Sequence, residues 1–357
     1  MHKPYKVQAA AALLDTTVDS VRRYIEESGV AVERQDHGPR TRQFTLDNIF
    51  ELAAWRQAHR SKTKIKKRGI ATIYAPKGGV GKTTITANVA CLFSLMGLRT
   101  LVIDLDFQAN LTLAFGYDSE LTIDEAKEAG VPEERIVEAH FGNLVPGWPG
   151  GRLPLSKVIK KPFGKHGPHL IPADLTLDRL DTILTYDALE GKKSDIKIAS
   201  MVQEGLSGKN KDFDLSGYDI ILFDAAPAKN RMTRGALLAS DYVVSPVSME
   251  KFSTKAISYL SSVLSDMRED MGRSPELVVV GNFFTPNRLR VINQMGVLSR
   301  EYPGALLDVV IRRSEDFPKT LSAEEDLPPL SLAKPTSDAS SELRAVADAL
   351  LVRMGVI

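Results

Sequence analysis

The hydrophobic pattern changes near residue 68 and divides the chain into two parts. Before it, apolar residues recur three or four positions apart, as Val18, Val21 and Ile25 do. After it, continuous runs of β-branched residues alternate with helical stretches. A helical period predicts amphipathic helices, whereas continuous runs between helices predict strands buried on both faces. We therefore expect a small helical N-terminal unit followed by a larger α/β unit.

The N-terminal unit has the order helix, turn, helix, hairpin, helix. Helices are predicted over 7–15, over 16–29 with Thr17 as N-cap, and over 45–59 with Thr45 as N-cap, and a Gly-Pro turn within 30–44 predicts a wing. This order resembles a MerR-type winged helix-turn-helix, in which the second helix enters the major groove. A small helical dimerisation or capping domain remains the alternative. The DNA-reading residues would be Thr17, Ser20, Arg22 and Arg23, with Arg40 and Arg42 of the wing near phosphates.

The second unit is predicted to be a mostly parallel sheet covered by helices on both faces. Its first helix follows the first strand over 83–97, and the chain closes with an amphipathic helix over 341–356. Residues 118–168 are rich in Gly, Pro and Lys, and we interpret them as an excursion from the sheet. The predicted strands cover 69–76, 99–106, 218–227, 241–248, 276–284 and 306–312.

Composition narrows the class of protein without changing this picture. Of the 357 residues, 43% are hydrophobic and 25% are charged, which is ordinary for a globular protein. No apolar run approaches the length of a membrane span, and the single cysteine, Cys91, excludes an internal disulfide framework. A cytoplasmic protein with a buried Cys91 is therefore expected.

Charge is distributed unevenly along the chain. Residues 1–70 contain 14 Lys and Arg against 8 Asp and Glu, and the excess peaks at "HRSKTKIKKR", residues 59–68. Such a run can be a solvated linker or a contact to nucleic acid. We expect a DNA-binding unit over 1–62, a basic linker over 63–68 and a second unit over 69–357.

The stretch "IYAPKGGVGKTT", residues 73–84, carries candidate chemistry. It places glycines between a buried strand and a helix start, where unsatisfied N–H groups and the helix dipole bind phosphate. It differs from G-x-x-x-x-G-K-[ST] because Pro76 replaces the first glycine and a second lysine, Lys77, follows. Lys82 is expected to reach β- and γ-phosphates, and Thr83 to bind Mg²⁺. The predicted cofactor-binding residues are Lys77, Gly78, Gly79, Val80, Gly81, Lys82, Thr83 and Thr84.

Three aspartates follow later strands and supply the other half of such a site. Asp104 and Asp106 end the strand "LVIDLD", and Asp224 ends "IILFD". Ligands gather at the carboxyl edge of an open α/β sheet, so we expect the three carboxylates to converge near the phosphate loop. A metal-side carboxylate is what phosphoryl transfer requires besides the loop.

Together these motifs resemble the ParA/MinD family of ATPases with a deviant Walker A motif. "KGGVGKTT" is similar to that motif, "DLDFQANLT" to the family's "DxDPQ-N" segment and "FDAAPA" to its Walker B segment. Phe107, Ala225 and Ala226 depart from the usual residues. The resemblance covers residue 69 to the C-terminus. The added N-terminal unit resembles long ParA proteins of plasmid partition, which repress their own operon.

The resemblance implies roles for individual residues. Lys77 would act in trans on the phosphates of a second subunit, so that the protein dimerises on ATP. Asp106 would orient the attacking water, Asp104 would couple the site to a switch segment, and Asp224 would hold Mg²⁺. Asn282 and Pro286 fall where the family's adenine pocket often forms. The basic loop residues Lys229, Arg231 and Arg234 could contact nucleotide, partner or DNA.

The expected function is an ATP-dependent partition ATPase, Mg²⁺-dependent and nucleoid-associated. The resemblance implies nonspecific DNA binding through Arg312 and Arg313, with Arg288 and Arg290 nearby, and stimulation by a centromere-binding, ParB-like partner. An iron–sulfur relative is excluded because it needs two cysteines per subunit. Membrane binding is not expected, because the last helix is not strongly basic. A nucleotide-tuned transcriptional repressor and a positioner of protein cargo remain alternatives.

Overall fold

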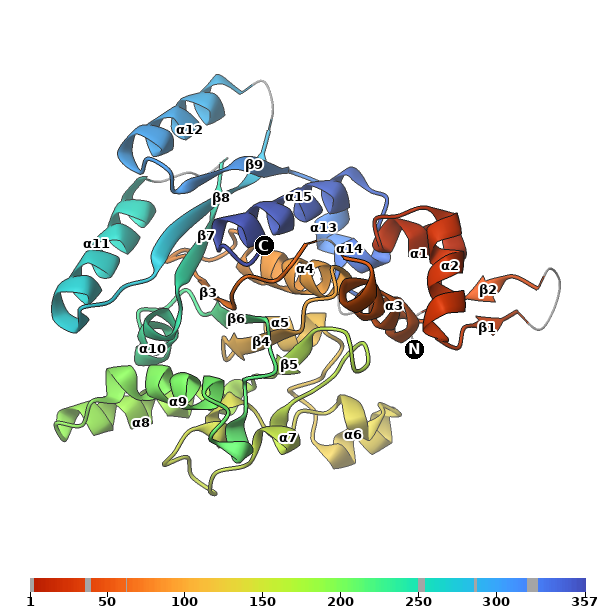
Figure 1. The fold of residues 1–357 in the computed structure, drawn as a ribbon. Coiled ribbons are helices and arrows are strands. Elements are labelled where there is room, and N and C mark those ends of the chain that lie inside the picture. Colours follow the sequence, from red (N-terminus) through yellow and green to blue (C-terminus); the bar gives the residue numbers. More distant parts are fainter. Residues whose placement is uncertain (1–2, 36–39, 62, 250–253, 286–287, 320–326) are drawn as a thin grey trace.

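We analysed a computed structural model of the chain, which describes residues 3–35, 40–61, 63–249, 254–285, 288–319 and 327–357. Its centre is a seven-stranded parallel sheet with the order β5-β4-β6-β3-β7-β8-β9 (Figure 1). The predicted parallel sheet is thereby confirmed. The strands are β3 (Gly69–Ile73), β4 (Thr100–Leu105), β5 (His169–Ile171), β6 (Ile220–Ala225), β7 (Tyr242–Ser248), β8 (Glu276–Phe284) and β9 (Leu306–Arg312).

Helices cover both faces of the sheet. One face packs against α4 (Lys82–Leu95) and α15 (Asp338–Arg353). The opposite face is covered by α8, α9, α10, α11 and α12. The second-face helices are α8 (Asp178–Leu189), α9 (Lys197–Leu206), α10 (Arg231–Ala239), α11 (Thr254–Met271) and α12 (Leu289–Glu301).

The segment 118–168 leaves the sheet, as expected, but it is not a loose excursion. Its 3-10 helix Phe141–Leu144 and the short helix α7 (Leu155–Val158) bury apolar side chains on the second face. The edge strand β5 that follows was not predicted, because three residues carry too little pattern. The remaining short elements are α5 (Asn110–Ala114), α6 (Ile123–Ala129), α13 (Asp316–Lys319) and α14 (Leu330–Ala333), with 3-10 turns at Glu133–Arg135, Leu175–Leu177, Ser194–Ile196 and Lys211–Phe213.

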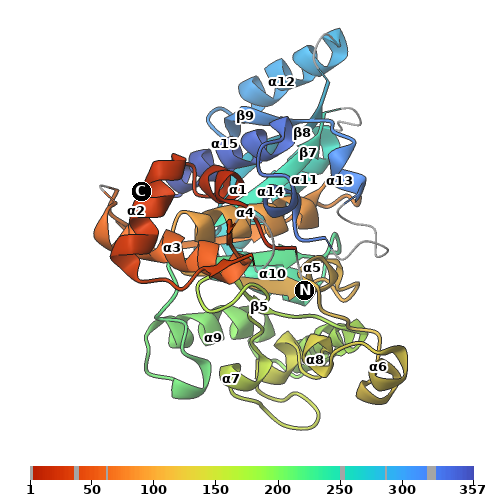
Figure 2. The same ribbon diagram turned by 90° about the vertical axis from the view of Figure 1, so that its right-hand side faces the viewer.

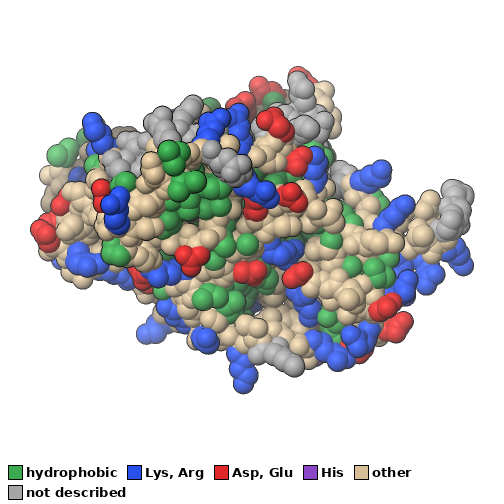
Figure 3. All heavy atoms as spheres, turned by 90° about the horizontal axis from the view of Figure 1, so that it is seen from above, with side chains coloured by type: hydrophobic (Ala, Val, Ile, Leu, Met, Phe, Trp, Pro, Cys, Tyr) green, Lys and Arg blue, Asp and Glu red, His purple; other side chains and the backbone are tan. Residues whose placement is uncertain are grey.

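The N-terminal unit contains the expected elements in the expected order. Helices α1 (Val7–Leu13) and α2 (Val18–Ser28) precede the antiparallel hairpin β1 (Glu33–Arg34) and β2 (Arg42–Gln43), and α3 (Leu46–His59) follows. The hairpin projects from one end of the molecule in Figure 1, and Figure 2 looks onto that end, with α1, α2 and α3 labelled there. Figure 3 shows Lys and Arg side chains gathered around this projecting end.

The N-terminal unit and the sheet share one hydrophobic core. Two arginines hold the N-terminal unit against the second unit by hydrogen bonds to backbone carbonyls. Arg56 of α3 donates to the carbonyl of Leu95 at 3.1 Å and to that of Leu14, and Arg344 of α15 donates to the carbonyl of Leu13 at 2.9 Å. We call these contacts, together with the packing of α3 on Gly97, the joint. Because the joint reaches α4, the N-terminal unit contacts the helix that begins at the phosphate loop.

Residues 63–68 are anchored at their end to the sheet. The Lys66 N–H donates to the carbonyl of Val356 at 2.8 Å. Lys67 lies over the ring of Tyr242, and the guanidinium of Arg68 donates to the carbonyl of Tyr218 at 2.7 Å. Part of this basic run therefore serves the fold.

Two further expectations hold. Cys91 is fully buried in α4, and burial raises the pKa of its thiol well above the usual value. Helix α15 packs its apolar side against α4 and β9. Within the described residues no helix combines the length and the apolar character that crossing a bilayer requires.

Candidate functional site: a phosphate loop facing three carboxylates

The loop between β3 and α4 is shaped to bind an anion. Gly79 and Gly81 have φ of +70° and +88°, values that glycine adopts without strain. Gly81 is the N-cap of α4, and no side chain caps this helix start. The first N–H groups of a 14-residue helix therefore face the loop without a side-chain acceptor, as a phosphate-binding helix start requires.

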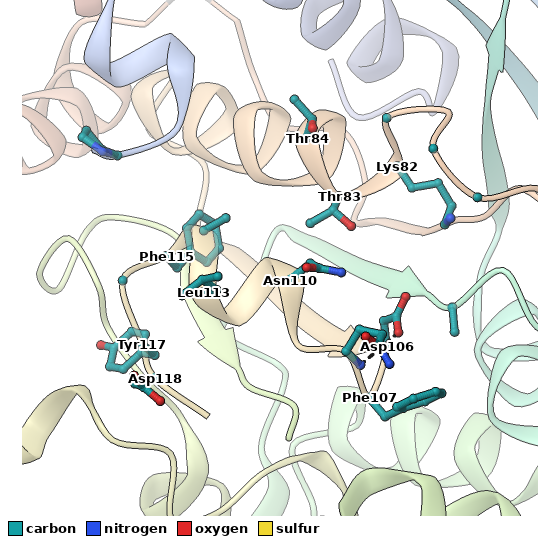
Figure 4. A pocket seen from close by; sticks show the side chains of 18 of the residues that line it. Lys82, Thr83, Thr84, Asp106, Phe107, Asn110, Leu113, Phe115, Tyr117 and Asp118 are labelled. Atoms are coloured by element: carbon teal, nitrogen blue, oxygen red, sulfur yellow. Dashed lines mark hydrogen bonds between the residues drawn. The ribbon is translucent and has the colours of Figure 1, made fainter. Parts of the chain in front are cut away.

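The loop forms one wall of a cavity of about 860 Å³. Figure 4 shows Lys82, Thr83 and Thr84 on one side of it and Asp106 and Phe107 on the other. The cavity continues between α4 and α5 toward Leu113, Phe115 and Tyr117. Among the residues predicted for the site, those lining the cavity are Gly78, Gly79, Gly81, Lys82, Thr83, Thr84 and Asp106.

Lys82 places its ammonium group among acidic side chains in a half-enclosed position. The residue is 8% exposed, and burial lowers the pKa of its ammonium. Asp224 and Asp106 oppose that shift, because their negative charges stabilise the protonated form. A bound phosphate would add negative charge beside Lys82 and hold it protonated.

Asp224 ends β6 and joins the loop through two hydroxyl groups. Its Oδ2 accepts from Thr83 Oγ1 and its Oδ1 from Thr86 Oγ1, both at 2.8 Å. Burial raises the pKa of Asp224 to about 6, against the lowering by these hydrogen bonds and by Lys82. A hydroxyl and a carboxylate at one point suit Mg²⁺, which takes one or two protein oxygens and completes its shell with phosphate and water.

Asp104 is fully buried at the end of β4, level with Asp224 in the sheet register. Its carboxylate accepts from the Asp106 N–H at 3.1 Å, the Thr112 N–H at 3.0 Å and Thr112 Oγ1 at 2.8 Å. Burial and the charge of Asp224 raise its pKa to about 8 despite these bonds. Asp104 thus holds α5 and the backbone of Asp106, while Asp106 itself lines the cavity.

Some predicted site residues lie elsewhere. Lys77 is exposed near the start of the loop, whereas Val80 is buried behind it. Asn282 is buried against the loop, with its Nδ2 2.9 Å from the carbonyl of Val80. Pro286 lies outside the described residues.

Of the three basic residues expected in a loop after β6, only Lys229 lies in the loop, whereas Arg231 and Arg234 belong to the first turn of α10. The Arg231 guanidinium donates to Asp195 at 2.5 Å, and Arg234 lies 3.6 Å from the same carboxylate. Lys229 lies 3.6 Å from the ring centroid of Tyr259. These contacts tie the start of α10 to the turn Ser194–Ile196 and the preceding loop to α11.

The residues predicted to read DNA are arranged along α2 and the hairpin. Thr17 caps α2 by accepting from the Ser20 N–H, and Arg22 and Arg23 are exposed on this helix. Arg22 forms an ion pair with Asp19 at 2.9 Å. Arg40 is exposed beside the hairpin, and Arg42 is half-buried in β2.

Arg312 and Arg313 follow one another at the end of β9. The Arg312 guanidinium is bonded to Glu342 and lies 3.7 Å from Asp338. Both arginines line a second cavity of about 630 Å³, which Arg288 also lines together with four acidic residues. The side chain of Arg290 lies outside the description. A DNA contact by Arg312 would compete with Glu342.

Sequence reasoning missed several residues of the site. Thr86 and Thr112 hold the buried carboxylates, and Gln108, Asn110 and Phe283 line the cavity. Thr86 had a signal, since it lies one helical turn after Lys82 and Thr83 and so faces the same side. Phe283 had none, because its position depends on how β8 ends beside the loop.

Comparison with known proteins agrees with this geometry. The profile of a family described as an AAA domain matches residues 68–277, more than half of the chain. The chain belongs to this family, and its relatives and fold place it among the ParA/MinD-type P-loop ATPases. The cell division protein PomZ of Myxococcus xanthus is 25% identical over 94% of this chain and 93% of its own. The chromosome-partitioning ATPase Soj of Thermus thermophilus is 25% identical over 82% and 98%.

A solved structure supports the fold. Cobyrinic acid a,c-diamide synthase from Mycobacterium smegmatis, crystallised with ADP and magnesium, superposes with a TM-score of 0.60. It is 19% identical, over 80% of this chain and 96% of its own. At this identity the likeness concerns the fold alone.

Proposed function

We propose that the protein is an ATP-dependent DNA partition ATPase. One observation carries this proposal: Lys82 and Thr83 share a cavity with Asp106, and Thr83 Oγ1 donates a hydrogen bond to Asp224 at 2.8 Å. A phosphate loop alone binds phosphate, whereas a loop facing a metal-side and a water-side carboxylate has the parts that hydrolysis needs. A relative that is 25% identical to this chain is a chromosome-partitioning ATPase.

The chemistry follows from the positions of the side chains. Thr83 and Asp224 would hold Mg²⁺, which would supply positive charge at the phosphates of ATP, and Lys82 supplies a second positive charge there. Asp106 accepts a hydrogen bond from water on the open side of the cavity. Lys77 is exposed on the loop, and we propose that it reaches the phosphates of a second subunit in an ATP-bound dimer.

The proposal also covers DNA binding, a partner protein and the location in the cell. The dimer binds DNA without sequence preference through exposed arginines, among them Arg312 and Arg313, and is therefore nucleoid-associated. A centromere-binding, ParB-like protein stimulates hydrolysis. The N-terminal unit binds the operator of its own operon through α2 and the hairpin.

One observation favours a second candidate, a nucleotide-tuned repressor. The joint ties α3 to the end of α4, so the N-terminal unit touches the helix that starts at the phosphate loop. Nucleotide could then adjust operator binding while partition is absent. PomZ, named a cell division protein, leaves positioning of a protein cargo as a related variant.

Binding to a random-sequence duplex tests these proposals. We would measure it without nucleotide, with ADP and with ATP, at two salt concentrations. Retention only with ATP, weakened by salt, supports the partition ATPase. Equal DNA binding without nucleotide, with ADP and with ATP would favour the repressor.

Two lysines of one loop serve as matched variants in that experiment. Lys82→Ala should abolish ATP binding, because it removes a charge at the phosphates. Lys77→Ala should keep ATP binding and lose both dimerisation and ATP-dependent DNA retention. Unchanged ATP affinity in Lys82→Ala would refute the loop assignment, and unchanged hydrolysis in Lys77→Ala would refute the role in trans.

A further inference from the structure

The carboxamide of Asn282 connects the end of β8 to the phosphate loop. Its Nδ2 donates to the carbonyl of Val80 at 2.9 Å, and its Oδ1 accepts from the N–H of Phe283 at 2.9 Å. The residue is 3% exposed. Buried polar groups without partners are costly, so both bonds stabilise this arrangement. One side chain thus holds two backbone segments that lie 202 residues apart.

The loop approaches this side chain as closely as a glycine permits. A Cβ on Gly81 would lie 2.4 Å from Asn282 Nδ2, well inside contact distance. Gly81 directly precedes Lys82, where α4 begins. Any shift of Val80 and Gly81 would therefore displace the Lys82 ammonium and the first N–H groups of the helix.

Phe283 adds a second, independent sign of a constrained site. Its φ of +54° is in the left-handed region, which costs a non-glycine residue about 1–2 kcal/mol. The hydrogen bond from its N–H to Asn282 holds it there. Its ring lines the cavity, 3.8 Å from the Cβ position of Gly81. Strained residues at a cavity wall point to a functional constraint.

We propose that Asn282 is a positioning residue, which preforms the phosphate loop and does not bind the adenine. Phe283, which its hydrogen bond aims into the cavity, supplies the wall for the base. The proposal rests on the proposed function, since it assumes that the cavity binds a nucleotide. It changes the expected role of Asn282, whose oxygen and amide are directed at backbone groups.

The two roles differ in which part of the ligand they affect. A residue that contacts adenine matters for ATP and is irrelevant for inorganic tripolyphosphate, which has no base. A residue that positions the loop matters equally for both. Binding of Mg·ATP and Mg·tripolyphosphate to the nucleotide-free full chain, measured by calorimetry, separates them.

We expect Asn282→Ala to weaken both ligands by the same factor, at least tenfold. Phe283→Leu is the matched variant: it should weaken ATP several-fold and leave tripolyphosphate unchanged. Hydrogen exchange of residues 78–84 without ligand should be faster in Asn282→Ala and unchanged in Phe283→Leu. A merely structural role would lower the melting temperature without this local effect. If Asn282→Ala does not fold, Asn282→Thr removes the carboxamide with almost no change in side-chain volume.

Two outcomes would overturn this proposal without contradicting the proposed function. One is a loss of ATP binding in Asn282→Ala with tripolyphosphate unaffected, which would make Asn282 an adenine contact. The other is unchanged binding of both ligands. If the unsubstituted protein bound neither ligand, the proposed function would fail together with this inference, and that result is distinct from both.

Discussion

The cavity and the joint differ in how their buried charged groups are partnered. Beside the cavity, Asp104 and Asp224 are buried next to each other on neighbouring strands, and burial raises the pKa of both carboxyls. At the joint, Arg56 and Arg344 each end on backbone carbonyls that a helix end leaves unsatisfied. The joint therefore stabilises the fold, whereas the two carboxyls beside the cavity are buried acids whose negative charge a metal ion would neutralise. Substitutions at the two places should change stability in opposite directions.

The largest effect is expected from Gly97→Ala at the joint. The new Cβ would lie 2.4 Å from Gln57 Cβ and 2.7 Å from the carbonyl oxygen of Ala53, at a φ of +85°. Overpacking and the left-handed backbone together should cost about 3 kcal/mol or more of unfolding free energy. Urea denaturation measures it.

Gly130→Ala is the matched control for that substitution. Gly130 has a φ of +69° at the end of α6, but a Cβ there would meet nothing within 4 Å. It should lose only the backbone contribution, about 1 kcal/mol. Equal losses in both variants would mean that α3 does not pack on Gly97 in solution.

A smaller loss is expected from Arg56→Met. The substitution keeps most of the stem and removes the hydrogen bonds to Leu14 and Leu95. Charge-assisted bonds to buried carbonyls are worth about 2 kcal/mol, and we expect a loss of that size in unfolding free energy. The control is Arg60→Met at the C-cap of the same helix, where an exposed pair with Glu27 is worth about 0.5 kcal/mol. If both variants lost the same, the joint would be no more important than a surface ion pair.

Asp104→Asn, beside the cavity, is expected to have the opposite sign and to raise the stability of the fold. Burial and Asp224 raise the pKa of Asp104 from 3.8 to about 8. The unfolded carboxyl ionises above its ordinary pKa while the folded one keeps its proton, so stability falls as pH rises between these two values. Without Asp104, the urea midpoint of the nucleotide-free protein should fall less between about pH 5 and about pH 8. Asp308→Asn, exposed on β9, is the control. A pH profile unchanged by Asp104→Asn would show that the proton is not held there.

The sequence predicts the residues of the site better than it predicts contacts between segments that are distant along the chain. The loop and the carboxylates were predictable, because each belongs to a short segment whose pattern places it at the carboxyl edge of the sheet. Partners distant in sequence were not: Asp195 for Arg231, Glu342 for Arg312, and Val80 for Asn282. A sequence shows that an arginine is present but not which carboxylate or carbonyl faces it. Exposure and pairing depend on packing between elements, which no local pattern records.

The smallest effect is expected where an exposed arginine is paired. The DNA contact proposed for Arg312 requires its guanidinium to leave Glu342. Glu342→Gln weakens that competition, so affinity for a random duplex with ATP should rise about two- to threefold, on the scale of an exposed ion pair. In the Arg312→Gln background, the additional Glu342→Gln change should leave DNA affinity unchanged. Arg312→Gln by itself should lower the slope of log affinity against log salt concentration by about one unit, because one phosphate contact is lost. If Glu342→Gln raises affinity equally in both backgrounds, it acts by removing a repulsive charge. Arg312 would then belong with Arg56 and Arg344 as an arginine that serves the fold.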